Sequence, residues 1–241
     1  MKPIVLLTWP KHADFPICRY NLKRYRPYFQ DIYIAFSEHH MGEDYSNFVR
    51  ENVDAKFIDA VITQGGDWRN DAINQTLDKL PPCEHILFLE QDFLIRDEEF
   101  FNKLFAEDHD YIYYVENDRK HPAFMCVKRN LVEQTRKNFS ASPPVDHFGL
   151  FTQDLDKLVE GQNIDNFGVV FKEDYYHMAG LTQNYKCFKY GDPFFRPNTF
   201  FYFNWKSSIL PEQSPFLALM EQVNHFPRPK IHEFLDKFFP E

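Results

Sequence analysis

Apolar and polar positions along the first half of the chain predict strands and helices in turn. Short apolar runs predict five strands, at residues 3–8, 31–36, 56–61, 86–90 and 111–115. Apolar residues at helical spacing between these runs predict helices, at residues 17–29, 67–80 and 97–105. This order of elements predicts an α/β fold with a doubly wound, mostly parallel sheet and helices on both of its faces.

The second half of the chain is less regular. The same patterns predict strands at residues 123–127 and 169–171 and helices at residues 130–139 and 153–159. From Gly191 onward the chain is rich in Phe, Pro and Trp. We therefore expect one domain over residues 1–190, with an aromatic, Pro-rich extension over residues 191–241 packed on it.

The predicted strand at residues 86–90 breaks directly into Glu90-Gln91-Asp92. Its continuous apolar run is typical of a central strand that is covered on both faces. In open α/β sheets, ligands bind beyond the carboxyl ends of such strands. Two carboxylates there would bind a divalent cation, which in turn would bind phosphates. The alternative is that both acids simply begin a solvated loop.

Three further features carry candidate chemistry. Gly66-Asp67 precedes Arg69 and Asn70 at a predicted helix start, where free amides and the helix dipole favour anions. Asp154 lies on a predicted helix and could accept a proton from a hydroxyl nucleophile. His177 follows a predicted strand and could complete a metal site that carboxylates begin. Each feature has an alternative explanation: the segment at 66–70 could be a capped helix with a surface arginine, Asp154 a solvated acid, and His177 a packed side chain.

Composition narrows the function classes. The formal net charge of −9 argues against broad nucleic-acid binding. Only 8 glycines are present and no glycine-rich phosphate-loop motif occurs, which argues against dinucleotide and P-loop sites. The 4 cysteines form no CxxC pair, as expected for free thiols in a reducing cytosol. No signal peptide or transmembrane segment is predicted, so we expect a cytoplasmic protein. The alternative is a protein that contacts a membrane peripherally through the basic residues of segment 19–26.

The order of these motifs resembles the GT-A nucleotide-sugar glycosyltransferases, in particular the inverting family 2 group. A glycine and Arg69-Asn70 open a helix, a strand ends in Glu90-Gln91-Asp92, and Asp154 and His177 follow. The resemblance spans about residues 3–180. It implies a GT-A-like, Rossmann-related sheet and a nucleotide-diphosphate sugar as donor, with a glycan or other hydroxyl-bearing acceptor.

The same resemblance implies roles for individual residues. Asp92, supported by Glu90, would bind Mn²⁺ or Mg²⁺ bridging the donor diphosphate, and His177 would be a further metal ligand. Asp154 would be the general base that deprotonates the acceptor hydroxyl for in-line attack on the anomeric carbon. Contacts with the donor are implied for Thr8, Glu38, Arg69, Asn70 and Gln91.

The chain departs from the family pattern at two positions. Glu90 stands where the first Asp of the metal motif is usual, and Gln153 stands where an acid usually precedes the base. Asp146 and Asp174 are the other candidates for the base.

The leading hypothesis is therefore a metal-dependent inverting glycosyltransferase. One alternative is a non-catalytic GT-A-like carbohydrate- or protein-binding module that uses the C-terminal aromatic residues. Another is a sugar nucleotidyltransferase, which is disfavoured because residues 6–11 lack the glycines of such enzymes.

Overall fold

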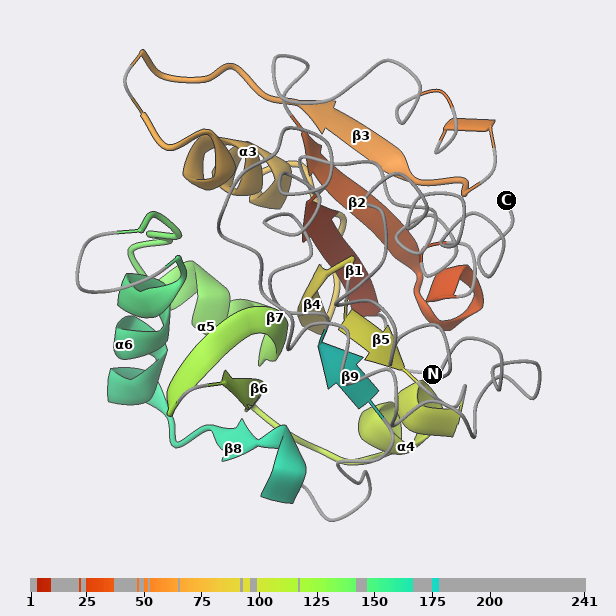
Figure 1. The fold of residues 1–241 in the computed structure, drawn as a ribbon, viewed down its shortest axis with the longest axis vertical. Coiled ribbons are helices and arrows are strands. Elements are labelled where there is room, and N and C mark those ends of the chain that lie inside the picture. Colours follow the sequence, from red (N-terminus) through yellow and green to blue (C-terminus); the bar gives the residue numbers. More distant parts are fainter. Residues whose placement is uncertain are drawn as a thin grey trace, which may run out of the picture.

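A computed structural model of the chain describes the predicted sheet and most of its helices (Figure 1). The residues it describes are 4–9, 22, 25–36, 47, 50–51, 53–64, 66–91, 93–95, 99–116, 118–141, 147–166 and 175–177. The proposed extension over residues 191–241 and the predicted strand at 169–171 lie outside them. The division into two parts at residue 190 therefore stays a prediction.

A seven-stranded sheet with the order β3-β2-β1-β4-β7-β6-β8 forms the centre of the molecule. Its strands are β1 Ile4–Trp9, β2 Asp31–Phe36, β3 Lys56–Asp59, β4 His85–Glu90, β6 Tyr111–Glu116, β7 Arg119–Lys128 and β8 Gln162–Asn163. All neighbours are parallel except β7, which is antiparallel to both β4 and β6. The prediction of a mostly parallel sheet is confirmed.

Strand β7 is reversed because it forms a hairpin with β6. Glu116 pairs with Arg119 across the turn, and Asp118 within the turn has a positive φ of 59°. Asp and Asn tolerate this left-handed conformation better than most residues, which suits Asp118 to its position in the turn. The hairpin returns the chain beside β4, so one antiparallel strand separates β4 from β6.

Helices cover both faces of the sheet, as the sequence predicted. Helices α3 (Trp68–Leu77), α5 (Arg129–Gln134) and α6 (Gly149–Leu158) bury apolar side chains on one face. Helix α4 (Glu99–Ala106) and the side chains that flank the 3₁₀ turn η1 (Arg26–Tyr28) pack on the other. Alternate residues of the buried strands supply each core, since successive strand side chains point to opposite faces.

Several helix boundaries differ from the sequence prediction; helix α3, for example, ends at Leu77 and not at residue 80. The helix expected over residues 130–139 ends at Gln134, because Thr135 is extended and its hydroxyl donates to the carbonyl of Val132 at 2.8 Å. The helix expected over residues 153–159 begins earlier, at Gly149. Helix α3 begins where predicted, with Asp67 as its N-cap accepting the backbone N–H of Arg69 at 3.0 Å.

A second, two-stranded sheet lies beside the end of β4. Strand β5 (Phe93–Ile95) pairs antiparallel with β9 (Tyr175–His177), and Phe93 is opposite His177. The 3₁₀ turn η3 (Ile164–Asn166) follows β8. Pairing with β5 brings the distant segment at 175–177 back to the strand that ends in Glu90.

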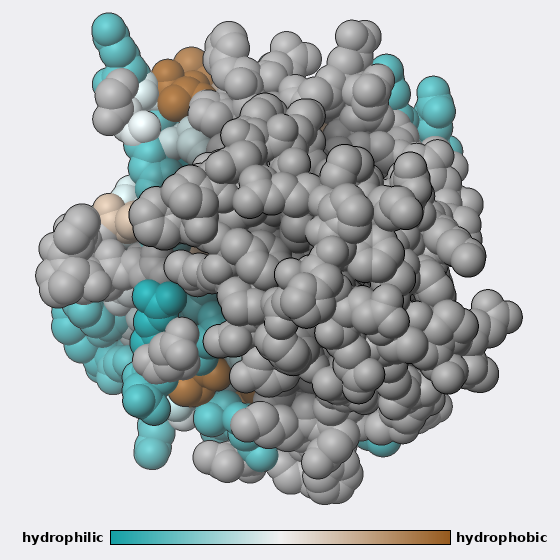
Figure 2. All heavy atoms as spheres, viewed as in Figure 1, coloured by the Kyte–Doolittle hydropathy of each residue, from teal (hydrophilic) through white to brown (hydrophobic). Residues whose placement is uncertain are grey.

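The described surface is mostly hydrophilic on the face that Figure 2 shows. Among the described residues, the large hydrophobic side chains that stand exposed are Val61 and Leu158. No helix in the described part of the chain is long and apolar enough to span a membrane.

Candidate metal centre

The sheet topology brings three strand ends to one edge. Strands β4 and β6 run in the same direction, so their carboxyl-terminal residues, Glu90 and Glu116, lie at the same edge. Strand β7 runs the opposite way, so its amino-terminal part, with His121, begins there. This is the edge at which open α/β sheets bind ligands.

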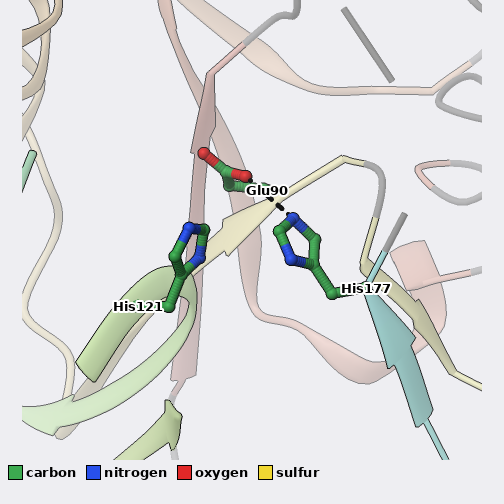
Figure 3. Close-up of side chains that lie close together, drawn as sticks. All are labelled: Glu90, His121 and His177. Atoms are coloured by element: carbon green, nitrogen blue, oxygen red, sulfur yellow. Dashed lines mark hydrogen bonds and ion pairs between the residues drawn. The ribbon is translucent and has the colours of Figure 1, made fainter. Parts of the chain in front are cut away.

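Glu90 and His177 form the centre of this group (Figure 3). The Nε2 atom of His177 lies 3.2 Å from Oε2 of Glu90, and both side chains are at most 5% exposed. The ring of His177 also packs against Phe93 and Tyr114, which restrict its orientation. The structure therefore brings together Glu90 and His177, which the sequence offered as candidate metal ligands.

Glu116 adds a second carboxylate behind His177. Its Oε1 lies 3.3 Å from Nδ1 of His177, and its Oε2 lies 3.4 Å from Nε2 of His121. Burial raises the pKa of Glu116, but the hydrogen bond from His177 and the electrostatic attraction of both histidine rings outweigh burial and leave the pKa below its ordinary value. Glu116 is therefore an ionised hydrogen-bond acceptor for two rings.

His121 completes the cluster from β7 (Figure 3). Its ring centroid lies 4.8 Å from that of His177, and the side chain is largely buried. One ligand atom each from Glu90, His121 and His177 lie within 4.8 Å of one another, a spacing that could hold a metal ion. A carboxylate and imidazoles are a suitable donor set for a divalent transition metal.

Sequence reasoning did not find Glu116 or His121. The one usable signal is the Asn117-Asp118 dipeptide between two strand-like runs, which is typical of a tight hairpin turn. A hairpin would have predicted that residues on both sides of the turn lie at the same sheet edge. Their approach to His177 depends on β9 and has no local signal.

Thr8 and Gln91, for which the resemblance implies contacts with the donor, lie near the carboxyl ends of β1 and β4. Thr8 pairs in register with Leu89 and is buried, and its hydroxyl donates to the carbonyl of Leu89 at 2.6 Å. This bond ties β1 to β4 one residue before Glu90. Gln91 follows Glu90 directly and is also buried.

Arg69 approaches the same edge through Trp9. Trp9 pairs in register with Glu90, and the guanidinium carbon of Arg69 lies 5.7 Å from the centroid of the Trp9 ring. Among the described residues, neither Nε of Arg69 nor Nε1 of Trp9 has a hydrogen-bond partner, although both atoms are buried. Buried donors without acceptors are costly, and an anionic ligand would satisfy them.

Asn70 has a structural partner in addition to its predicted position near the donor. Its Oδ1 accepts the backbone N–H of Phe139 at 2.9 Å, which fastens the chain after α5 to the first turn of α3. Its backbone carbonyl accepts the side-chain amide of Asn74 at 3.0 Å. The side chain is therefore held in place by the fold.

Asp154 lies on α6 and forms an ion pair with Arg136. Its carboxylate oxygens accept from Nε and Nη2 of Arg136, at 2.7 and 2.9 Å. The side-chain hydrogen bond from Arg136, which outweighs the opposing effect of burial, holds the pKa of Asp154 well below its usual range. Lys157 is a further partner, at 3.2 Å. The structure thus brings Glu90 and His177 together but describes Asp154 in a separate ion pair.

Several predicted site residues lie outside the described part of the chain. They are Glu38, Asp92 and the two other candidate bases, Asp146 and Asp174. Of the four cysteines, Cys83 and Cys126 are described, and both are free thiols.

Comparison with known proteins identifies the fold. Neither a scan against protein-family models nor a search of curated proteins finds a match. Among solved structures, glucosyl-3-phosphoglycerate synthase from Mycobacterium tuberculosis, in complex with Mn²⁺, uridine diphosphate and glucosyl-3-phosphoglycerate, matches with a TM-score of 0.52 at 12% identity. The match covers 73% of this chain and 72% of that chain. The chain has a GT-A-type fold.

Two other matches have TM-scores below 0.5. A 4-diphosphocytidyl-2C-methyl-D-erythritol synthase from Anaerococcus prevotii has a TM-score of 0.49 at 12% identity and covers 72% of this chain and 94% of its own. A glycosyltransferase involved in the glycosylation of the major capsid of PBCV-1 has a TM-score of 0.44 at 13% identity, with 76% and 97% covered. The assignment of the GT-A-type fold therefore rests on the mycobacterial synthase.

Proposed function

We propose that this protein is a metal-dependent, inverting glycosyltransferase that moves a sugar from a nucleotide-diphosphate donor to an acceptor hydroxyl. The observation that carries the proposal is the buried pair of Glu90 and His177, 3.2 Å apart, at the carboxyl end of β4 in a GT-A-type fold. The structurally similar mycobacterial synthase holds Mn²⁺ and uridine diphosphate.

The residues of this edge fit a divalent cation. Glu90 supplies a carboxylate oxygen and His177 an imidazole nitrogen, and Asp92 lies two positions beyond Glu90. When bound, Mn²⁺ or Mg²⁺ supplies Lewis-acid stabilisation of the charge that develops on the leaving diphosphate. The chain's own residues hold the two ligand groups in a buried, rigid position before any ligand arrives.

The donor diphosphate would lie beside Arg69 and Trp9. Arg69 lies in the first turn of α3, where the helix dipole also favours an anion. The buried donors Nε of Arg69 and Nε1 of Trp9 would each gain an acceptor from the bound nucleotide. Thr8, Glu38, Asn70 and Gln91 are the further donor contacts in this proposal.

The general base is assigned to Asp154, with Asp146 and Asp174 as the other candidates. Because Arg136 lowers the pKa of Asp154, this carboxylate is a weak proton acceptor while the ion pair is intact. Proton transfer from the acceptor hydroxyl to Asp154 thus requires Arg136 to release it. If Asp154 stays in its ion pair with Arg136, the second candidate function is favoured, which is a GT-A-type module that binds its ligand without transferring sugar.

A thermal-shift screen of the full chain with nucleoside diphosphates and sugar nucleotides tests the proposal. We expect one nucleotide to raise the melting temperature only together with Mn²⁺ or Mg²⁺, and Asp92→Ala, Glu90→Gln and His177→Ala to abolish this rise. Glu133→Gln is the matched control, because the ion pairs of Glu133, with Arg129 on α5 and with Lys137 after it, involve none of the site residues. An unchanged melting temperature across the whole panel would contradict the proposal.

Release of nucleoside diphosphate from the stabilising sugar nucleotide separates transferase from binding module. We expect release that depends on the metal and increases with a suitable acceptor. If the sugar nucleotide stabilises the protein but neither the wild type nor Arg136→Gln releases nucleoside diphosphate, the result would instead support the binding module.

A further inference from the structure

The tautomer of His121 is determined by an irregularity of β7. The pairing of β6 with β7 shifts register between Tyr113, opposite Met125, and Tyr114, opposite His121. The three residues of β7 between these positions, Pro122, Ala123 and Phe124, therefore form a bulge against β6. Within this bulge the backbone N–H of Ala123 donates to Nδ1 of His121 at 3.1 Å. An imidazole nitrogen that accepts a hydrogen bond carries no proton, so the ring proton of His121 is on Nε2.

This proton faces Glu116. Nε2 of His121 lies 3.4 Å from Oε2 of Glu116, and an ionised carboxylate can only accept. The other oxygen of Glu116, Oε1, lies 3.3 Å from Nδ1 of His177. For the same reason Nδ1 of His177 is the donor in this contact. Glu116 therefore fixes two imidazole rings at once, one on β7 and one on β9.

The orientation of His177 follows from that contact. With Nδ1 turned toward Glu116, Nε2 is the nitrogen that faces Oε2 of Glu90, at 3.2 Å. By the same rule this contact holds a proton between Nε2 and Glu90 while no cation is present. A cation that displaces this proton would be bound by the Nε2 lone pair and the Glu90 carboxylate together. Histidines that bind metals commonly donate their second N–H to a carboxylate in this way.

His121 is close enough to be mistaken for a third ligand. Its ligand atoms lie within the 4.8 Å group, yet Nδ1 accepts the N–H of Ala123 and Nε2 points its proton at Glu116. We infer that Glu116 and His121 are positioning residues, which hold the ring of His177 with Nε2 toward the metal, and that neither binds the metal. This inference rests on the proposed function, since it takes the Glu90–His177 pair as the metal site.

Mn²⁺ binding to the full chain without nucleotide, followed by electron paramagnetic resonance, tests the inference. Glu116→Gln is expected to weaken Mn²⁺ binding about 10- to 100-fold, the usual cost of losing such a carboxylate. Glu116→Asp is expected to recover part of the affinity. His121→Gln keeps a donor near the position of Nε2 and is expected to bind Mn²⁺ better than His121→Leu. Glu133→Gln is again the control, with unchanged affinity.

Two spectroscopic readouts separate positioning from ligation. Electron spin echo measurements on bound Mn²⁺ should detect one imidazole nitrogen ligand in the wild type and in both His121 variants, and none in His177→Ala. Nitrogen-15 spectra of the metal-free protein should show Nδ1 unprotonated in His121 and protonated in His177. This last readout is independent of metal binding and of sugar transfer.

The outcomes distinguish the inference from the proposed function. Two imidazole ligands in the wild type, one of them lost in His121→Leu, would overturn the positioning role. Wild-type Mn²⁺ affinity in Glu116→Gln would do the same while leaving the proposed function intact. Absence of Mn²⁺ binding by the wild type without nucleotide would overturn the inference. The proposed function would be overturned separately, by a melting temperature that no nucleotide raises together with Mn²⁺ or Mg²⁺.

Discussion

Glu90 and His177 are 87 positions apart in the chain and 3.2 Å apart in the fold, with both side chains buried. A carboxylate alone would serve Mg²⁺ and Mn²⁺ alike, because both are bound by oxygen ligands. The imidazole nitrogen of His177 favours Mn²⁺, because Mg²⁺ accepts a nitrogen ligand less readily than Mn²⁺ does. The identity of this one residue therefore bears on metal choice.

We expect the protein to prefer Mn²⁺ over Mg²⁺, by about tenfold or more in half-saturating concentration, given the mixed donor set. His177→Asp should narrow the preference, because it replaces nitrogen with oxygen. Titration of the nucleotide-dependent thermal shift with each metal measures this. Equal concentrations of the two metals in the wild type would contradict it.

Asn70 serves the fold through its bond to the backbone N–H of Phe139. Asn70→Ala leaves that partly buried N–H without its acceptor, at a cost of about 1–3 kcal/mol. At roughly 2–4 °C for each kcal/mol in a chain of this size, thermal unfolding should detect the loss readily.

The exposed Asn130 on α5 provides the control, and Asn130→Ala should unfold like the wild type. A change in nucleotide-dependent stabilisation in Asn70→Ala, beyond the loss of stability, would support the predicted donor contact as well. An unaltered melting temperature in Asn70→Ala would contradict the structural role.

At the scale of elements, α3 depends on Asp67. This residue caps the helix through the N–H of Arg69, and its second oxygen lies 3.4 Å from the N–H of Ala141. Asp67→Ala should cost about 1 kcal/mol, whereas Asp67→Asn should retain most of the cap. Denaturant unfolding of the two variants measures the difference. Equal stability of both with the wild type would count against the cap.

Helix α6 is fastened to the segment after α5 by Asp154 and Arg136. The pKa of Asp154 is lower in the folded than in the unfolded state. The ion pair therefore stabilises the fold at pH values above the unfolded pKa, which is about 3.9. That contribution is lost as pH falls toward the lower, folded value. Arg136 is 60% exposed, so solvent screening keeps the effect modest.

Arg136→Gln should therefore melt below the wild type at neutral pH, and the gap should close as the pH falls below about 4. Lys157→Gln is the comparison, with a smaller gap because Lys157 is more exposed and its bond is longer. Melting curves between neutral and acidic pH measure both. A gap that widens in acid would falsify the assignment.

At the scale of the whole molecule, Phe88 connects the sheet to the helices on one face. It is fully buried on β4, and its ring packs against Phe139, Phe148 and Phe151. Phe88→Ala should cost about 3–5 kcal/mol, because it removes apolar contacts and leaves a cavity.

Equilibrium unfolding in denaturant measures this cost. Phe88→Leu, which retains most of the volume, should lose clearly less, and a similar loss in both variants would argue against the aromatic cluster as the source. Glu90, the proposed metal ligand, stands two residues after Phe88 on β4, so local unfolding around Phe88 should also abolish metal binding.

The sequence by itself determined the elements and most of their order. Apolar runs predict β1, β2 and β4 closely, because a buried strand needs few residues and tolerates no polar side chain in its middle. The Asp67 cap and the break into acids after Leu89 are local signals as well. The break into acids placed Glu90 among the candidates for the site, and His177 was a candidate because it follows a predicted strand.

Only the tertiary structure decided which residues meet. Glu116 and His121 reach the site because β7 turns back between β4 and β6, and His177 does because β9 pairs with β5. The β6–β7 hairpin has a local signal in its turn, whereas the pairings of β7 with β4 and of β9 with β5 join distant segments that no local pattern encodes. The same holds for Arg136, whose bond to Asp154 joins the segment after α5 to α6 and lowers the pKa of the acid that the sequence offered as a base. Local pattern determines strands and caps, whereas contacts between distant segments determine the chemistry at their ends.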